Sequence, residues 1–574
     1  MATVTVQPEQ PMPRVAGHLR TVSIPTRYAA LAAVCLCAAL TVFFSAYTAD
    51  TAWSFPRFLI AAFVLIYVPG QCVLRRFGSE LPQLENLLLS VILGMVTSSV
   101  IYAMCTATHV QPLFLAWPSV TSAALLWETR RRWDPWLHGQ LQVSGAHLAL
   151  ALVLVATLAP LVINPRFLTN FDLDPEGVLQ IRSQILDALL HLSVVHELSH
   201  SFPPSAQFLS GVPLAYHVGS DIVPALLIKM GGAHHLDVMF RYIPAVYLGL
   251  LILATFTAAR RWLGSAYGGV LVAMLVALGE DFSFIPGILR MSTGYWSVQY
   301  FEAPSTFSFY TFNPMLLAVT VFFSALLTLQ YWWTTRHASW FLITALLLAL
   351  LIQLKIFLLP HIIVSLAAVG IVAFARWRDG RLLALVACTL AIAIPLYLVT
   401  LGQSESAERQ LVRLFPFQYL DIMLREFGLG GSTIGTSVKS LYFDAEVTIS
   451  TVLWTVGVAL PVYLIGAFGW RMIGASLLLR SLWPTRETQL RAVAAVFVLT
   501  GAAVTLLFSV SAAGIPARET YNNAIWFIVA SKHMAWLFAV EWIVTRARAS
   551  TMSGRYLLVL ITLCLSLPST IQTF

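Results

Sequence analysis

Charged residues are scarce in this chain of 574 residues: Asp, Glu, Lys and Arg make up 10% of it, whereas 58% is apolar. A soluble globular domain carries about 25% charged residues, so this scarcity excludes an ordinary soluble protein. Runs of about 20 apolar residues recur, each long enough to cross a bilayer as a helix. Because lipid offers the backbone no hydrogen-bond partners, these segments should be helices. We therefore predict an all-α, polytopic integral membrane protein.

Cysteines are also few, and all six fall inside the apolar runs: Cys35, Cys37, Cys72, Cys105, Cys388 and Cys564. This distribution indicates neither a disulfide framework nor a cysteine zinc site. Residues 1–27 are polar, lack a cleavable signal pattern, and are predicted to be a disordered cytoplasmic tail. We see no internal sequence repeat.

Fifteen apolar stretches are predicted to span the membrane: 28–48, 54–74, 87–108, 112–127, 146–163, 239–259, 266–285, 311–332, 339–357, 360–376, 382–401, 447–469, 491–511, 521–545 and 555–572. We divide them into an N-terminal module of about four spans (28–145), a membrane core (146–401) and C-terminal spans (447–574). Residues 402–446 contain a glycine-rich stretch and are predicted to be a flexible outer gating loop.

Arginines crowd into alternate short loops between these spans: Arg75–Arg76, Arg130–Arg131–Arg132, Arg260–Arg261, Arg376, Arg378, Arg381, Arg471, Arg480, Arg486, Arg491, Arg546, Arg548 and Arg555. The positive-inside rule places these loops and the N-terminus in the cytoplasm. The net charge of +8 follows from this pattern and does not indicate nucleic-acid binding. The C-terminus and the long loops 164–238, 286–310 and 402–446 then lie outside.

The loop 164–238 contains six of the 13 histidines and seven of the 26 acidic residues. Residues 178–200 carry apolar side chains at helical spacing and predict an amphipathic helix in the interface plane, ended by Phe202-Pro203-Pro204. Residues 214–230 are apolar but interrupted by polar side chains. If they formed a span, Arg260–Arg261 would move outside, so we predict a second interfacial or re-entrant helix.

The order of motifs in this loop resembles that of bacterial membrane glycosyltransferases of the GT-C superfamily, which use lipid-linked sugar donors. The matching residues are Asp187 and His191, Phe202-Pro203-Pro204, Gly211-Val212-Pro213-Leu214-Ala215-Tyr216-His217, Gly231–Gly232, Arg241 and Arg260–Arg261. The resemblance covers about residues 146–290, and residues 1–145 look like an added module.

This resemblance implies a GT-C-like fold in a bacterial cytoplasmic membrane. It also implies transfer of a sugar, with inversion at C1, from a polyprenyl-phosphate donor to a glycan, lipid or protein acceptor at the outer face. Membrane lipids are expected partners, and nucleic acid is not.

A hydroxyl acceptor must lose its proton as the bond between C1 and the phosphate breaks, and a carboxylate near the acceptor can act as the general base. Asp172 and Asp174 occupy the family's usual position soon after a span, whereas Asp187 has His191 one turn away to orient it. Asp174 before Pro175 could equally be a helix N-cap. All three carboxylates therefore remain candidates.

The leaving phosphate requires a cation in a poorly solvated site. The candidates are Lys355, Arg290, Arg518 and Lys532. A lysine inside a span is a functional hypothesis by default, although Lys355 could also extend its ammonium group to the interface.

Three further side chains, Tyr216, His217 and Asp221, are candidates for lining an acceptor groove. Aromatic residues at this depth also serve as membrane anchors, so Tyr216 has a structural alternative.

Residues 196–200 read His-Glu-Leu-Ser-His, which matches the zinc-peptidase pattern on a predicted helix. His196 and His200 would be metal ligands and Glu197 the base. The sequence marks no third ligand, although His191, His217 or Asp221 could serve. No other cofactor is predicted, and a divalent metal would bind here.

A non-enzymatic chain is the remaining alternative: a transporter, a flippase or a non-catalytic subunit of a membrane complex. Transporters carry charges or broken helices near the bilayer midplane, often in two matching halves. The sequence shows no such halves, and its acids concentrate in the predicted outer loops. We therefore favour the glycosyltransferase.

Overall fold

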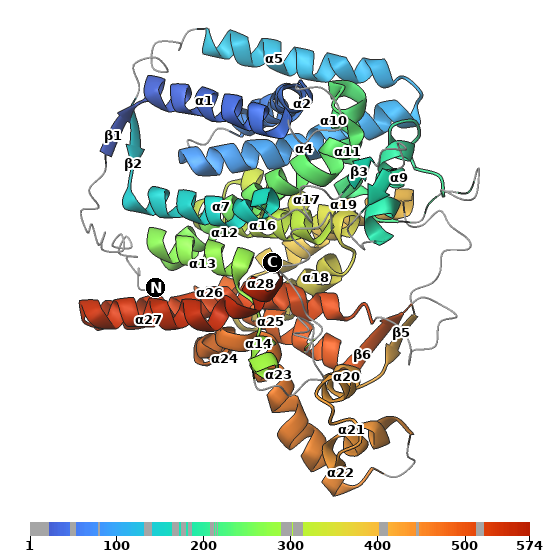
Figure 1. Ribbon diagram of the computed structural model, residues 1–574, viewed down its shortest axis with the longest axis vertical. Coiled ribbons are helices and arrows are strands. Elements are labelled where there is room, and N and C mark those ends of the chain that lie inside the picture. The colour runs from blue at the N-terminus through green and yellow to red at the C-terminus, as the bar shows by residue number, and fades with distance from the viewer. Residues whose placement is uncertain are drawn as a thin grey trace, which may run out of the picture.

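The computed structural model describes residues 22–45, 53–77, 81–130, 140–163, 171–173, 179–181, 186–206, 212, 214, 216–288, 301, 314–400, 411–443, 447–511 and 522–573. These residues are predominantly helical, as the sequence predicts, and the only strands among them form three antiparallel pairs. Figure 1 shows most of the helices lying side by side in one bundle, with the helices of residues 418–454 projecting beyond it.

The first third of the chain forms α1 (Thr26–Ser45), α2 (Ser54–Ala62), η1 (Phe63–Tyr67), α3 (Val68–Arg76), α4 (Gln83–Ala107), η2 (Gln111–Leu115), α5 (Ala116–Thr129) and α7 (Gly145–Ile163). The following segment forms α9 (Leu186–Leu198), α10 (Gly219–Gly231), α11 (His235–Asp237), η3 (Val238–Tyr242), α12 (Ile243–Leu263), α13 (Ala266–Leu278) and α14 (Phe284–Ile288).

The second half forms α16 (Pro314–Thr335), α17 (Ala338–Leu354), α18 (Leu358–Trp377), α19 (Arg381–Thr400), α20 (Gln418–Glu426), α21 (Thr433–Phe443), α22 (Ile449–Trp454), η4 (Thr455–Ala459), α23 (Leu460–Phe468), η5 (Gly469–Gly474), α24 (Ala475–Ser481), α25 (Gln489–Leu507), α26 (Ile525–Ala549), α27 (Met552–Ser566) and α28 (Pro568–Thr573). The strand pairs are β1 (Val22–Pro25) with β2 (Gln140–Val143), β3 (Phe171–Leu173) with β4 (Leu179–Ile181), and β5 (Leu411–Leu414) with β6 (Phe508–Ser511).

Nine continuous helices among the described residues are long and apolar enough to cross a membrane: Ser54–Arg76, Gln83–Ala107, His235–Leu263, Pro314–Thr335, Leu358–Trp377, Arg381–Thr400, Ile449–Ser481, Gln489–Leu507 and Ile525–Ala549. Shorter apolar helices accompany them, including α7, α13, α17 and α27. The chain is therefore a multi-pass helical membrane protein, and the number of fifteen spans remains a prediction.

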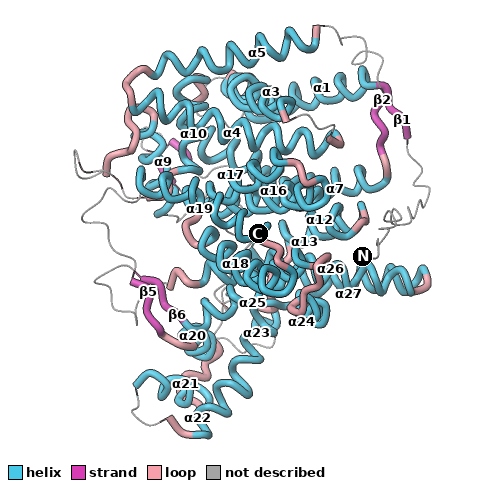
Figure 2. Tube along the Cα trace, turned by 180° about the vertical axis from the view of Figure 1, so that it is seen from behind, coloured by secondary structure: helices cyan, strands magenta, loops and turns pink. Residues whose placement is uncertain are grey.

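Arginines gather at one end of this bundle. Arginines occupy the last turns of α3, α12, α18, α24 and α26. At this arginine end, Arg260 Nη2 lies 2.5 Å from Glu85 Oε1 at the start of α4. The pairs β1–β2 and β5–β6 lie at opposite edges of the bundle, as both views show (Figures 1 and 2). The arginines in the last turns of these five helices thus lie together at one end of the long axis of the bundle.

Two sequence-based boundaries in the first half are wrong. Residues 178–200 do not form one helix, because residues 179–181 pair with 171–173 as a hairpin. Asp187 is therefore the second residue of α9 and not a mid-helix residue. The disordered tail predicted to end at residue 27 is also too long, since β1 pairs with β2 and α1 begins at Thr26.

The predicted spans 266–285 and 447–469 also need correction. Helix α13 ends at Leu278, before two adjacent acidic residues. The helix predicted to end at residue 469 continues to Ser481, so Arg471 lies inside the bundle and is 2% exposed. Its placement in a cytoplasmic loop is wrong.

The predicted flexible loop 402–446 contains β5, α20 and α21 within its described part, and Gly428 (φ 71°) lies in the turn after α20.

Candidate functional site

Two buried side chains from neighbouring helices form the centre of the candidate site. His191 on α9 is 1% exposed and Asp221 on α10 is fully buried. His191 Nδ1 lies 2.9 Å from Asp221 Oδ1, and Ser220 Oγ lies 3.4 Å from Asp221 Oδ2. A carboxylate at Nδ1 holds a proton on that nitrogen, so Nε2 is the nitrogen that can act as a base. This is the arrangement that a histidine general base requires.

A glycine permits the close approach that places Asp221. A Cβ atom on Gly219 would lie 2.8 Å from the backbone oxygen of Gln353, at the end of α17. Only a residue without a side chain lets the start of α10 pack against α17 at this distance. Helix α10 is buried against neighbouring helices from Ile222 to Leu227. That this segment is a second interfacial or re-entrant helix stays a prediction.

The same site contains three more residues from the sequence prediction. The Tyr216 ring lies 4.1 Å from the His217 ring and 5.8 Å from the His191 ring, centroid to centroid. Lys355 lies in the break between α17 and α18 and is 8% exposed. Its Nζ atom lies 4.1 Å from the centre of the Trp526 ring. We refer to His191, Tyr216, His217, Asp221 and Lys355 together as the polar cluster.

Burial and neighbouring charge shift the protonation of this cluster. Burial lowers the pKa of His217 well below its ordinary value, and the positive charge of Lys355, with that of His191 whenever His191 is protonated, lowers it further. Burial raises the pKa of Asp221, while the charge and hydrogen bond of His191 and the hydrogen bond of Ser220 oppose that rise. Perturbed pKa values of several groups in one place are typical of functional sites.

An apolar cavity of about 620 Å³ lies beside the helical turn that carries Asp221, and no side chain of the polar cluster lines it. It is lined by Ile92, Met95, Val96, Ser99, Val100, Ala103, Met104, Ala107, Phe202, Pro203, Gly219, Ile222, Val223, Leu317, Val321, Leu350, Gln353, Leu354, Ile392, Pro395, Leu396, Val399 and Thr400. Gly219 and Ile222 flank the helical turn that carries Asp221, and Gln353 is two residues from Lys355. The first cavity therefore suits a hydrocarbon chain whose polar end reaches the cluster.

Other predicted site residues are not placed by the structure. The backbone of Asp172 lies in β3 and that of Asp187 in α9, but their side chains lie outside the described part of the chain. Asp174, Arg290 and Arg518 lie outside it altogether. The choice among the three carboxylates stays a prediction. The structure instead identifies a partner for His191 that spacing alone could not, because Asp221 follows it by 30 residues.

The two histidines of the zinc-peptidase pattern lie next to each other at the end of α9. Their ring centroids are 4.9 Å apart, and His200 Nδ1 lies 3.0 Å from the His196 carbonyl oxygen. Among the residues that the structure describes, no group of three or more His, Cys, Asp and Glu side chains is arranged to hold a metal ion. The peptidase remains an untested alternative.

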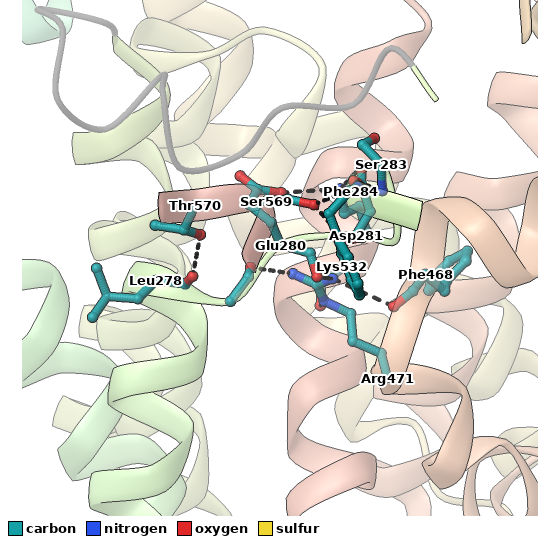
Figure 3. Close-up of polar contacts among 11 residues, drawn as sticks. Leu278, Glu280, Asp281, Ser283, Phe284, Phe468, Arg471, Lys532, Ser569 and Thr570 are labelled. Carbon is teal, nitrogen blue, oxygen red and sulfur yellow. Dashed lines mark hydrogen bonds and ion pairs between the residues drawn. The ribbon is translucent and has the colours of Figure 1, made fainter. Parts of the chain in front are cut away.

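A second buried polar group lies at the break between α13 and α14, where this break packs against α26 and η5 (Figure 3). Lys532 Nζ on α26 lies 3.6 Å from Glu280 Oε2 and 3.3 Å from Asp281 Oδ2, in the break between α13 and α14. All three side chains are at most 2% exposed. The Lys532 predicted to bind phosphate thus pairs with two carboxylates. Two adjacent acids within the apolar run 266–285 were the sequence signal for this site.

Arg471 completes this group by donating to backbone carbonyls at the helix breaks. Its guanidinium donates to the carbonyl oxygens of Lys532 (3.0 Å), Glu280 (3.2 Å) and Gly279 (2.7 Å). It also lies 4.4 Å from the centre of the Trp536 ring. The orphan carbonyls that a helix break leaves are therefore satisfied by a side chain. Arg471 ties the end of α13 to α26.

No known protein family matches this sequence, and no curated protein matches it. Among solved structures, the chain is similar to the archaeal oligosaccharyltransferase AglB from Archaeoglobus fulgidus in complex with an inhibitory peptide and a dolichol-phosphate, with 14% sequence identity and a TM-score of 0.40. The match covers 78% of this chain and 56% of that chain. A similarity this distant identifies neither the family nor the activity, so the polar cluster carries the functional argument.

Proposed function

We propose that this protein is a membrane glycosyltransferase of GT-C type. It moves a sugar from a polyprenyl-phosphate donor to an acceptor hydroxyl at the outer face of a bacterial cytoplasmic membrane. The arginine end of the bundle then faces the cytoplasm, in keeping with the positive-inside rule. The polar cluster lies toward the other face.

One observation supports this proposal above the others: chain neighbours of Asp221 and Lys355, namely Gly219, Ile222, Gln353 and Leu354, line an apolar cavity of about 620 Å³, and Asp221 is paired with His191. A lipid-linked sugar needs an apolar space for its chain, a cation for its phosphate and a base for the acceptor, all within one site. A soluble substrate would have no use for the cavity, whose lining is almost entirely apolar.

In the proposed reaction, the acceptor hydroxyl donates its proton to His191 Nε2 as its oxygen bonds to C1 of the sugar. The bond between C1 and the phosphate oxygen breaks, and polyprenyl phosphate leaves with the electron pair. Asp221 holds His191 in the tautomer that leaves Nε2 basic. Lys355 stabilises the negative charge on the leaving phosphate.

The remaining predicted residues take supporting places in this proposal. Tyr216 and His217 line the acceptor side, and the neutral His217 offers a hydrogen bond without adding charge. Asp172, Asp174 or Asp187 would replace His191 as the base if substitution of the histidine proves harmless. Arg290 and Arg518 would add cations for the phosphate.

The test is sugar transfer in nanodiscs from a panel of radiolabelled polyprenyl-phosphate hexoses and pentoses, with the host membrane fraction as acceptor. We expect His191→Gln and Asp221→Asn to lower the rate by about 10²–10⁴-fold, the usual contribution of a general base. Lys355→Met should lower it by about 10²–10³-fold.

The matched control is Asp379→Asn, because Asp379 is a buried aspartate that pairs with Arg381 at the arginine end. It should retain transfer. Unchanged transfer by His191→Gln, Asp221→Asn and Lys355→Met, in protein that melts normally, would remove the polar cluster from the reaction.

Lipid or solute transport is the second candidate, and the helix breaks around Lys532 favour it. Discontinuous helices with buried charges at membrane depth are typical of transporter sites. Uptake or flipping by reconstituted protein that is abolished by Lys532→Met but unaffected by His191→Gln would favour transport over sugar transfer.

A further inference from the structure

A second apolar cavity of about 750 Å³ lies nearer the arginine end than the first, since its lining includes Leu84 at the start of α4. It is lined by Phe58, Ala62, Phe63, Ile66, Tyr67, Leu84, Leu87, Val91, Met95, His147, Leu150, Ala151, Leu154, Val223, Leu227, Ile243, Val246, Gly249, Leu250, Ile252 and Leu253. Helices α4, α7, α10 and α12 form most of its wall, together with α2 and η1. The N-terminal module therefore builds this cavity jointly with the membrane core.

Side chains on α4 line both cavities. Positions 84, 87, 91 and 95 line the second cavity, and positions 95, 99, 103 and 107 line the first. At about 100° per residue, these two sets lie on faces of α4 that are roughly a third of a turn apart, and Met95 belongs to both. Positions 84 and 107 are about 35 Å apart along the helix axis at 1.5 Å per residue. The hydrocarbon core of a bilayer is about 30 Å thick, so the two cavities together extend across both leaflets.

Met95 and Val223 line both cavities and so form part of the wall between them. They are 6% and 2% exposed. Methionine is unbranched and has three rotatable bonds, so its side chain can move aside at little cost. A chain that enters beside the polar cluster can therefore continue from the first cavity into the second when Met95 changes rotamer.

We propose that the two cavities form one passage for a single hydrocarbon chain longer than one leaflet, and that Met95 and Val223 select for such chains. The occupant is the long polyisoprenoid of the donor lipid, with its phosphate at Lys355, so this inference rests on the proposed function. A phospholipid acyl chain covers about half of the 30 Å core and would end in the first cavity. The N-terminal module thereby gains a role in holding the far half of the donor lipid.

The first test compares a long-chain donor with one whose chain spans roughly 15 Å, half the hydrocarbon core. Met95→Trp fills the junction. Transfer from the long-chain donor should fall more than about tenfold, because losing the burial of two methylene groups alone changes an equilibrium by about that factor. Transfer from the short-chain donor should fall by a smaller factor, because the short chain occupies only the first cavity, which Met95 also lines. Equal losses for both donors would overturn the inference.

Val364→Trp is the matched control, because Val364 is 53% exposed on the outside of α18 and its side chain lines neither cavity. It should leave both donors unaffected. Should Met95→Trp fail to fold, Met95→Ala serves instead: it widens the junction and should raise the ratio of long-chain to short-chain transfer.

The second test needs no sugar transfer and so separates this inference from the proposed function. Polyprenyl phosphate with a photoreactive diazirine at the far end of its chain is bound to the intact protein and irradiated. Crosslinks on peptides that contain Leu150 or Val246 support a single passage, even if no transfer is ever detected. Crosslinks there only from a diazirine phospholipid, and not from the long-chain probe, would mean that two separate lipids fill the cavities.

Discussion

Replacing Lys532 by Met should destabilise the protein more than most single substitutions. Lys532 Nζ lies 3.3 Å from Asp281 Oδ2 and 3.6 Å from Glu280 Oε2, and its side chain is fully buried. Removal of one partner from a buried ion pair costs about 3–5 kcal/mol, because it leaves an uncompensated charge. Here it leaves two adjacent carboxylates. The charge of Arg471 acts on both carboxylates and offsets part of this cost, although its hydrogen bonds in this group go to backbone carbonyls. We expect the free energy of unfolding to fall by about 3–5 kcal/mol.

The assay is reversible unfolding in mixed micelles, followed by far-UV circular dichroism. Adding Glu280→Gln and Asp281→Asn to Lys532→Met should restore most of the loss, since a buried ion pair can be replaced at little net cost when both charges go. Lys439→Met is the control: Lys439 donates to the Gly430 carbonyl at the half-buried surface and should change stability by less than about 0.5 kcal/mol. A loss below about 1 kcal/mol for Lys532→Met would refute the reasoning about an uncompensated buried charge.

Three further outcomes follow from single contacts. Burial lowers the pKa of His217, so the unfolded state binds a proton on this histidine more readily than the folded state does. The free energy of unfolding should therefore drop as the pH falls below 6.5. His217→Gln should reduce that drop, as measured by melting curves at pH 7.5 and 5.5. Gly219→Ala places a Cβ atom 2.8 Å from the Gln353 backbone oxygen, so the free energy of unfolding should fall by about 1–3 kcal/mol and sugar transfer should decrease. The control is Gly431→Ala, whose Cβ atom meets no atom within 4 Å and should change neither stability nor transfer. Arg471→Lys keeps the positive charge but loses the planar guanidinium that donates to three carbonyl oxygens. The free energy of unfolding in micelles should therefore fall by more than about 2 kcal/mol. An unchanged value would mean that the charge alone, and not the hydrogen bonds, stabilises the helix break.

Hydropathy predicted the helices well and their interruptions poorly. The run 266–285 averages as apolar even though it contains Glu280 and Asp281, because a hydropathy window smooths over two charged residues. The break appears only once Lys532, far along the chain, is known to neutralise them. Arg471 was assigned to a loop for a related reason: an arginine ends a predicted span unless tertiary contacts satisfy its guanidinium.

The candidate site was predictable as a set of residues but not as a geometry. Polar side chains within apolar segments marked His217, Asp221 and Lys355, because burying them without partners would be costly. The pairing of His191 with Asp221 depends on how α10 packs against α9 and α17, which no local pattern encodes. The short strands β3 and β4 were likewise hidden by apolar spacing that also fits a helix.

The most direct test of the proposed site is an experimental structure of the protein in nanodiscs with polyprenyl phosphate bound. The proposal predicts phosphate density within hydrogen-bond distance of Lys355 Nζ and chain density in the cavity that Gly219, Gln353 and Leu396 line. Phosphate density beside Lys532 or at the arginine end, with the first cavity empty, would contradict it.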